Sequence, residues 1–301
     1  MKKPIVIVIL GQTATGKSNL AVKIARKING EIISADSRQI YKGLDIGTGK
    51  ITQKEMKGVP HHLLDVINPK KTFTVSDFIK MTNLAIAEIV AIGKIPIICG
   101  GTGFYIDAIT KGIIFPKVPP NIKLRKKLAL VSDRVLMLKL QKLDPKRAKD
   151  IEPKNKVRLI RAIEITKALG KVPSLKQYSN SSDSNSAMAE SVSPFKFIKI
   201  GLYLPLDILK NKIERRVKKM FKMGLLKEIE KLKKPARRGG AGVSEKRLRE
   251  LGFEYDDPTE EKVIRETIKY AKRQMTWFKR DKEIKWFDAS NKVDLAKINL
   301  F

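Results

Sequence analysis

The chain has 301 residues, 42% of them hydrophobic, which is enough for one large domain or two modest ones with buried cores. Its 63 Lys and Arg residues outnumber 31 Asp and Glu residues, and the net charge of +32 favours a polyanionic partner, although a lysine-rich solvated surface would give the same surplus. A single cysteine excludes a disulfide framework and a cysteine-based zinc site, and no segment approaches transmembrane length, so we expect a soluble cytoplasmic protein.

The apolar run at 5–10 predicts a strand that leads directly into a phosphate-binding loop, GQTATGKS. An apolar-periodic helix is predicted at 18–28, which is the context that this motif requires. In such a loop the backbone N–H groups converge on a phosphate, the lysine adds positive charge, and the Ser18 hydroxyl can bind Mg²⁺. The predicted phosphate-binding residues are Gly11, Gln12, Thr13, Ala14, Thr15, Gly16, Lys17 and Ser18.

Further strands are predicted at 31–35 and 95–99, with a helix at 76–93 between them. This alternation is typical of a P-loop NTPase-like α/β fold, in which helices flank a parallel sheet. Because ligands bind at the carboxyl ends of parallel strands, Asp36 should stand beside the phosphate loop. It could bind Mg²⁺, accept a proton from a nucleophile, or only cap a turn.

The predicted strand at 95–99 is followed by Gly-Gly-Thr-Gly, with no acid to hold the Mg²⁺-bound water of a hydrolytic NTPase. Hydrolysis is therefore not favoured, although a kinase that uses Asp36 as its base stays possible. His61 and His62, the only histidines, are expected in a turn before Leu63.

The amino-acid composition changes after Pro116. Basic helical segments at 124–130, 134–143 and 157–169 come first, and a serine-rich stretch at 174–193 follows them. Strand-like sequence returns at 195–204, and basic helices follow to about 233 and again at 259–280. We therefore predict a discontinuous core, 1–112 and 197–301, interrupted by a mainly helical insertion at 113–196.

Several blocks together resemble the bacterial tRNA dimethylallyltransferase family, also called tRNA isopentenyltransferases. They are GQTATGKS, ISADSRQIYKGLDIGTGK (33–50), PHHLLD (60–65), GGTGFYIDA (100–108), NKVRLIRAIE (155–164) and YAKRQMTWF (270–278), in order over nearly the whole chain. The phosphate loop is common to many families, but DSRQIYKGLDIGT is highly specific.

The resemblance implies a prenyl transfer from dimethylallyl diphosphate to N6 of the adenine 3′ of the tRNA anticodon, with Mg²⁺ as cofactor. The loop and Arg216 would then hold the diphosphate, and Asp36 would accept the proton from N6, with Lys17 and Ser18 also catalytic. The resemblance implies tRNA contacts, made by the insertion and the motif residues, at Asp36, Ser37, Arg38, Gln39, Thr102, Arg125, Val157, Arg158, Leu159, Ile160 and Arg161.

Two other functions stay open from the residues alone. A P-loop small-molecule kinase would turn over ATP, and a basic RNA-binding protein with a vestigial phosphate site would need neither Lys17 nor Asp36. We expect a monomer whose partners are tRNA and dimethylallyl diphosphate.

Overall fold

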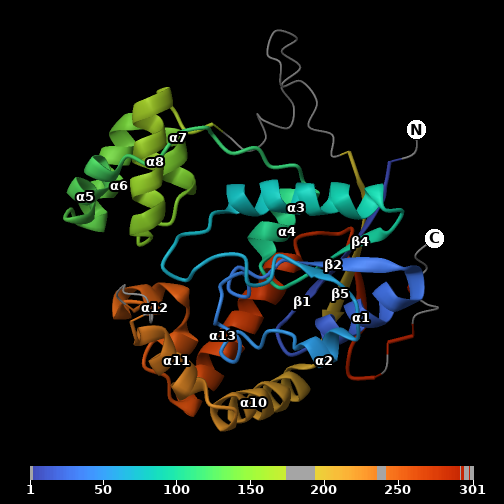
Figure 1. Ribbon diagram of the computed structural model, residues 1–301. Helices are drawn as coiled ribbons and strands as arrows, with labels where there is room; N and C mark the ends of the chain where they lie inside the picture. The colour runs from blue at the N-terminus through green and yellow to red at the C-terminus, as the bar shows by residue number, and fades with distance from the viewer. Residues whose placement is uncertain (1–2, 174–193, 236–241, 292, 295–297, 299–301) are drawn as a thin grey trace. The chain divides into compact units, whose positions relative to one another are not determined.

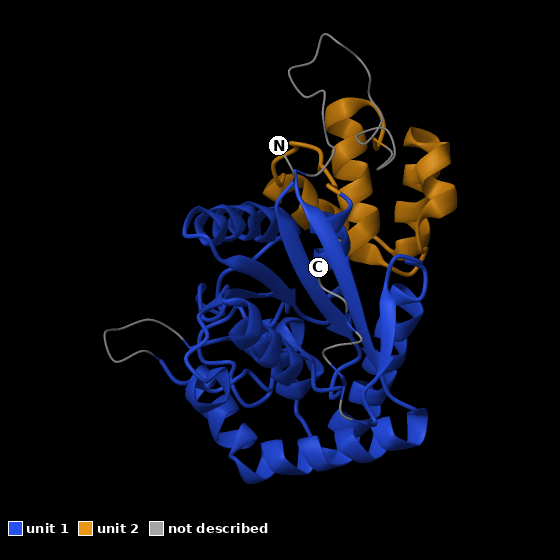
Figure 2. Ribbon diagram, turned by 90° about the vertical axis from the view of Figure 1, so that its right-hand side faces the viewer, with its two compact units in different colours: residues 1–111, 193–301 blue, residues 112–192 orange. Residues whose placement is uncertain are grey.

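The computed structural model describes residues 3–173, 194–235, 242–291, 293–294 and 298. The chain forms two compact units, 1–111 with 193–301 and 112–192, which Figure 2 colours separately. The second unit nearly coincides with the predicted insertion at 113–196. The serine-rich stretch 174–193 lies outside the described residues.

The larger unit is built on a six-stranded sheet in the order β3-β2-β4-β1-β5-β6, with every pair parallel. Its strands are β1 (Ile5–Gly11), β2 (Gly30–Ser34), β3 (His61–His62), β4 (Ile95–Cys99), β5 (Lys196–Tyr203) and β6 (Lys285–Asp288). The P-loop NTPase-like α/β fold is thereby confirmed, and Figure 1 shows the elements in place.

Helices cover both faces of this sheet, which is why its central strands are nearly continuous runs of Ile and Val. The helices of the larger unit are α1 (Lys17–Ile28), α2 (Gln53–Met56), α3 (Val75–Ala91), α4 (Gly103–Thr110), α10 (Leu206–Lys222), α11 (Leu225–Lys233), α12 (Glu245–Leu251) and α13 (Glu260–Phe278), with a short 3₁₀ helix, η1 (Phe253–Tyr255).

Alternate side chains of β1 enter different clusters, as the period of two in a strand requires. Val6 and Val8 pack in one cluster with residues of α3, α4 and α13. Ile7 and Ile9 pack in the other with residues of α1. The phosphate loop that follows β1 is therefore held on a strand that is buried on both sides.

The smaller unit is helical, as predicted for the insertion. It contains α5 (Ile122–Ala129), α6 (Asp133–Leu143), α7 (Pro145–Asp150) and α8 (Lys156–Leu169). Leu136, Leu140, Leu159 and Ile163 are wholly buried in its own core.

The predicted turn at His61 and His62 is wrong, since these residues form β3 and pair with Ile32 and Ile33 of β2. The Nε2 atom of His62 lies 2.7 Å from Oε2 of Glu31, also on β2. A two-residue strand is too short to show the alternating pattern of a strand in the sequence. Only its pairing with β2 in the folded protein reveals it.

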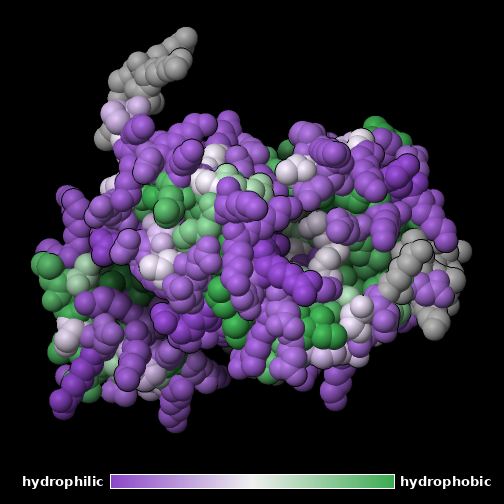
Figure 3. Space-filling model, turned by 90° about the horizontal axis from the view of Figure 1, so that it is seen from below, coloured by the Kyte–Doolittle hydropathy of each residue, from purple (hydrophilic) through white to green (hydrophobic). Residues whose placement is uncertain are grey.

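The face shown in Figure 3 is mostly hydrophilic, and its apolar side chains form small separate groups. Among the residues that the structure describes, no helix has both the length and the apolar character needed to cross a membrane.

Candidate active site

The phosphate loop joins β1 to α1 through residues whose backbone φ is positive. Gly16 has a φ of 88° directly before α1, and Ala14 also has a positive φ, of 63°. A methyl group at Gly11 would lie 2.1 Å from the carbonyl oxygen of Leu202 in β5. Both glycines of the motif are therefore needed, one for its φ and the other for close packing of two backbones.

Lys17 is the charged group of the loop, and its ammonium donates to the backbone carbonyl of Gln12. Burial lowers the pKa of Lys17 to about 8, and the nearby Arg216 guanidinium acts in the same direction. Burial raises the pKa of the neighbouring Cys99 thiol to about 11, so this cysteine is a neutral strand residue. Lys17 thus carries its charge at neutral pH but loses it more readily than an exposed lysine does.

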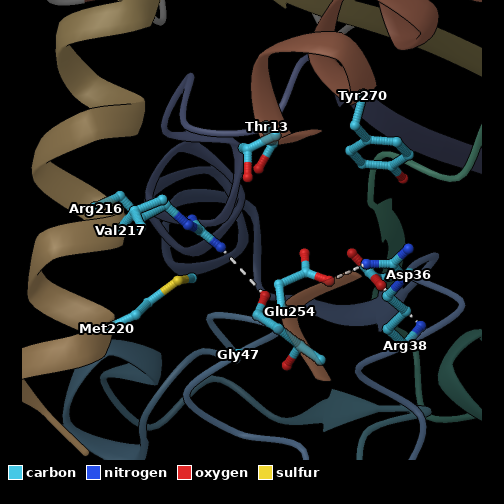
Figure 4. Close-up of a pocket in the computed structure, with 11 residues that line it drawn as sticks. Thr13, Asp36, Arg38, Gly47, Arg216, Val217, Met220, Glu254 and Tyr270 are labelled. Atoms are coloured by element: carbon cyan, nitrogen blue, oxygen red, sulfur yellow. Dashed lines mark hydrogen bonds and ion pairs between the residues drawn. The ribbon is translucent and has the colours of Figure 1, made fainter. Parts of the chain in front are cut away.

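Two cavities adjoin beside the phosphate loop, at the carboxyl ends of the strands. The first, which we call the phosphate cavity, is lined by Thr13, Ala14, Gly16, Lys17, Ser18, Asn19, Asp36, Gln39, Thr48, Gly49, Ile51, Glu55, Cys99, Gly100, Gly101, Arg216, Tyr270 and Gln274. The second, which we call the inner cavity, is lined by Thr13, Asp36, Arg38, Gly47, Thr48, Arg216, Val217, Met220, Glu254, Thr267 and Tyr270 (Figure 4). Asp36 and Arg216 line both cavities and thus stand where the two meet.

Asp36 follows β2, at the carboxyl end of a strand, as expected. Its Oδ1 atom accepts hydrogen bonds from the backbone N–H groups of Arg38, at 2.9 Å, and Gln39, at 3.4 Å. These bonds fix the carboxylate at the cavity wall. Asp36 and Lys17, which lie 19 residues apart in the sequence, therefore line one cavity.

Ser37 and Thr102 lie beside the cavities and are not lining residues of either. The backbone N–H of Ser37 donates to Oγ1 of Thr102 at 3.0 Å, which ties the segment after β2 to the start of α4. Gln39 does line the phosphate cavity, and its Nε2 donates to the carbonyl of Thr48 at 3.3 Å.

Arg38 lines the inner cavity, where its guanidinium forms an ion pair with Glu254 (Figure 4). The guanidinium also lies 5.0 Å from the ring centre of Phe253 and 5.9 Å from that of Tyr270. Burial raises the pKa of the Glu254 carboxyl, an effect that the Arg38 charge partly offsets. The ion pair with Arg38 therefore opposes the effect of burial on an acid that lines the same cavity as Asp36.

Arg216 projects from α10 into the site, and its Nη2 donates to the carbonyl of Thr48 at 3.2 Å (Figure 4). Burial lowers the pKa of its guanidinium, and the opposing charges of Asp36, Glu254 and Glu55 partly offset that effect. A half-buried cation that lines the same cavity as Lys17 is well placed to bind an anion there.

Gln274 belongs to the block YAKRQMTWF, whose sequence predicted no role for this side chain. Gln274 is buried in α13, and its Oε1 accepts from the backbone N–H of Thr13 at 2.8 Å. Its Nε2 donates to the carbonyl of Gly101 at 2.8 Å, and a methyl at Gly101 would lie 2.2 Å from that nitrogen. One side chain thus joins the phosphate loop to the turn after β4.

Tyr270, Glu254 and Thr48 were also missed as lining residues. Burial raises the pKa of the Tyr270 hydroxyl to about 12, so it remains a proton donor at neutral pH. Thr48 and Tyr270 lie in the family blocks 33–50 and 270–278, which were the signals for them in the sequence. Glu254 lies in no such block, and nothing local to it indicates that it reaches the site.

In the smaller unit, Arg125 and Arg161 are both bound by the buried carboxylate of Glu164. Arg125 donates through Nε at 2.9 Å and Nη2 at 2.7 Å, and Arg161 pairs with the same carboxylate. Burial raises the pKa of Glu164, but these hydrogen bonds outweigh it and lower the value to about 2. Both arginines remain partly exposed, so each can bind a further anion.

The neighbouring predicted residues differ in exposure. Val157 and Arg158 are exposed and Ile160 is half-buried. Leu159 is wholly buried in the core of the unit, where its side chain supports α8. That the segment 157–161 contacts tRNA stays a prediction.

Two family models match this chain, "IPP transferase" over residues 39–281 and "Isopentenyl transferase" over residues 4–71. It is 41% identical to the tRNA dimethylallyltransferase of Halothermothrix orenii, with 94% of this chain and 87% of that protein covered. It is 37% identical to the tRNA dimethylallyltransferase of Bacillus subtilis, with 98% and 93% covered.

Solved structures agree with these similarities. The crystal structure of a full-length tRNA isopentenylpyrophosphate transferase from Bacillus halodurans has a TM-score of 0.65 and 36% identity, covering 98% of this chain and 93% of that one. A eukaryotic dimethylallyltransferase acting on tRNA has a TM-score of 0.75 and 27% identity, covering 98% and 75%. With its phosphate loop, its acid after β2 and these similarities over nearly its full length, the chain belongs to the IPP transferase family.

Proposed function

We propose that this protein transfers a dimethylallyl group from dimethylallyl diphosphate to N6 of the adenine 3′-adjacent to the anticodon of tRNA. The observation that carries the proposal is the placement of Lys17, Asp36 and Arg216 on one cavity, in a chain whose relatives are named tRNA dimethylallyltransferases. We also propose a monomer as the active unit.

The reaction follows from these side chains. The N6 lone pair attacks C1 of the dimethylallyl group, the C1–O bond breaks, and the diphosphate leaves with the bonding electrons. Lys17, Arg216 and the loop amides stabilise the charge that develops on the leaving diphosphate. Asp36 accepts the proton that N6 loses, because a carboxylate held by two backbone N–H groups keeps one oxygen for the substrate.

The side-chain oxygen atoms that line the phosphate cavity suit Mg²⁺, which prefers hard oxygen ligands. This ion is commonly bound by a protein and by phosphates together. The Ser18 hydroxyl lines the phosphate cavity, as do Asp36 and Glu55, and Ser18 is the proposed ligand. A magnesium ion held there would supply further positive charge to the diphosphate.

The charge surplus supports a tRNA partner, since the phosphate backbone dominates the affinity of proteins for nucleic acid. An adenine in an anticodon loop has to leave its stack to enter a protein cavity, as in other enzymes that modify bases. The kinase and the vestigial RNA-binding protein are not favoured, because the relatives reported above are named as transferases that act on tRNA.

Labelled dimethylallyl diphosphate and an unmodified tRNA with adenine beside the anticodon test the proposal. We expect Mg²⁺-dependent transfer of the label to this tRNA and none to a matched tRNA with guanine at that position. ATP turnover stimulated by a small alcohol, without transfer of the label, would favour the kinase instead.

A further inference from the structure

Glu228 of α11 lies outside both cavities, yet its carboxylate binds the backbone of the segment that lines them. Its Oε2 accepts from the backbone N–H groups of Asp45, at 3.0 Å, and Ile46, at 2.7 Å. Its Oε1 accepts from the N–H of Gly47, at 3.1 Å, and from the hydroxyl of Tyr255, at 2.9 Å. Four hydrogen bonds thus converge on one carboxylate.

Three consecutive N–H groups that point to one place form an anion-binding nest, which here is filled by a side chain of the same protein. Gly47 and Tyr255 pack too closely for a larger residue at position 47, because a methyl there would lie 2.6 Å from the hydroxyl oxygen of Tyr255. Bonds to a carboxylate are stronger than bonds between neutral groups, so Glu228 holds residues 45–47 firmly.

The next two residues contact Arg216. The carbonyl of Thr48 accepts from Nη2 of Arg216 at 3.2 Å. Gly49 has a φ of 57°, and a methyl there would lie 2.0 Å from the same nitrogen. The segment 45–49 is therefore fixed by Glu228 at one end and shapes the place of the guanidinium at the other.

We propose that Glu228 is a positioning residue for the diphosphate, which acts by holding the segment 45–49 against Arg216. This inference rests on the proposed function, in which Arg216 binds the leaving diphosphate. Glu228 touches neither cavity, so it affects the ligand only through the backbone that it orders and the guanidinium that this backbone directs.

The variant Glu228→Gln tests this role, because its amide NH₂ would replace one of the two accepting oxygens and face a backbone N–H. Its matched control is Glu230→Gln, which removes an exposed carboxylate from the same helix. We expect Glu228→Gln to raise the Kd for inorganic diphosphate with Mg²⁺ by about tenfold in titration calorimetry, while tRNA affinity stays within about twofold. Glu230→Gln should change neither.

A double-mutant cycle separates positioning from general stability. If Glu228 acts through Arg216, the variant Arg216→Gln should bind diphosphate no more weakly when Glu228→Gln is added to it. If the losses of diphosphate affinity in the two single variants add up in the double variant, the proposal is overturned. Wild-type diphosphate affinity in Glu228→Gln would overturn it as well.

Should Glu228→Gln fail to fold, Tyr255→Phe provides a milder variant that removes only the hydroxyl from the same carboxylate. It should weaken diphosphate binding in the same direction, again without an added effect in Arg216→Gln. Diphosphate binding is measured without tRNA, so the two proposals can fail separately. A wild-type protein that binds diphosphate but transfers no prenyl group contradicts the proposed function. The double-mutant cycle then still decides whether Glu228 acts through Arg216.

Discussion

Asp36 is the residue on which the proposed chemistry depends most directly. A positioned general base contributes about 10² to 10⁴ in rate, so Asp36→Ala should lower single-turnover prenyl transfer by that factor. Asp36→Asn keeps the shape of the side chain but cannot take the proton, and it should be nearly as slow. Binding of tRNA should change far less, because phosphate contacts elsewhere supply most of the affinity. Near wild-type transfer by Asp36→Asn would show that the proton leaves by another route.

Lys17 makes diphosphate binding depend on pH. Its pKa is lowered to about 8 in the folded protein, so the ammonium is charged below pH 8 and loses its proton above it. The Kd for inorganic diphosphate should therefore rise by about tenfold between pH 7 and pH 9, which calorimetry at several pH values can measure. Lys17→Arg stays charged over this range and reports the titration of the ligand alone. If the Kd of the wild type and that of Lys17→Arg changed with pH in the same way, Lys17 would not be the group that titrates.

At the scale of elements, α13 holds the phosphate loop and the turn after β4 through one side chain. Gln274→Leu leaves the Thr13 N–H and the Gly101 carbonyl without their partner, and leaving such a group unpaired costs about 1 to 3 kcal/mol. Since two groups lose their partner, we expect the free energy of unfolding in urea to fall by at least about 1 to 3 kcal/mol and diphosphate binding to weaken. Thr276→Ala, an exposed change in the same helix, is the control.

Gln274→Glu refines this experiment. The carboxylate can still accept from the Thr13 N–H, but it places a second acceptor against the Gly101 carbonyl. It should therefore be no more stable than Gln274→Leu. If it matched the wild type instead, the bond to Gly101 would contribute nothing, and only the bond to the phosphate loop would matter.

At the scale of the whole molecule, the positive charge predicts salt-dependent tRNA binding. Each phosphate contact contributes a slope of about 0.7 to 0.9 in a plot of log K against log salt concentration. Replacing exposed Lys126 and Arg158 of the helical unit with glutamine should reduce the slope by up to about 1.8. Filter binding of tRNA between 50 and 200 mM salt is a suitable assay.

Lys282 and Lys285 give the control pair for that measurement. Both are exposed and belong to the larger unit, Lys282 just before β6 and Lys285 as its first residue. Their replacement by glutamine should leave the slope unchanged. Equal losses in both pairs would mean that the charge acts diffusely and that the helical unit does not form a specific clamp.

The sequence by itself determined the features whose cause is local. Continuous Ile and Val runs predicted the main strands, and the spacing of Gly11, Gly16, Lys17 and Ser18 predicted the phosphate loop. The same pattern placed Asp36 at the end of a neighbouring strand. These features follow from backbone preferences and from periods that can be counted within a few residues.

Only the tertiary structure decided which distant polar groups meet. The contact of Thr13 with Gln274 spans 261 residues, that of Arg38 with Glu254 spans 216, and that of Ile46 with Glu228 spans 182. A glutamine or glutamate on a helix has the same local pattern whether it faces water or a buried N–H. Its partner is chosen by how the helices pack on the sheet, so the polar scaffold of the site exists only once the apolar core has brought those helices together.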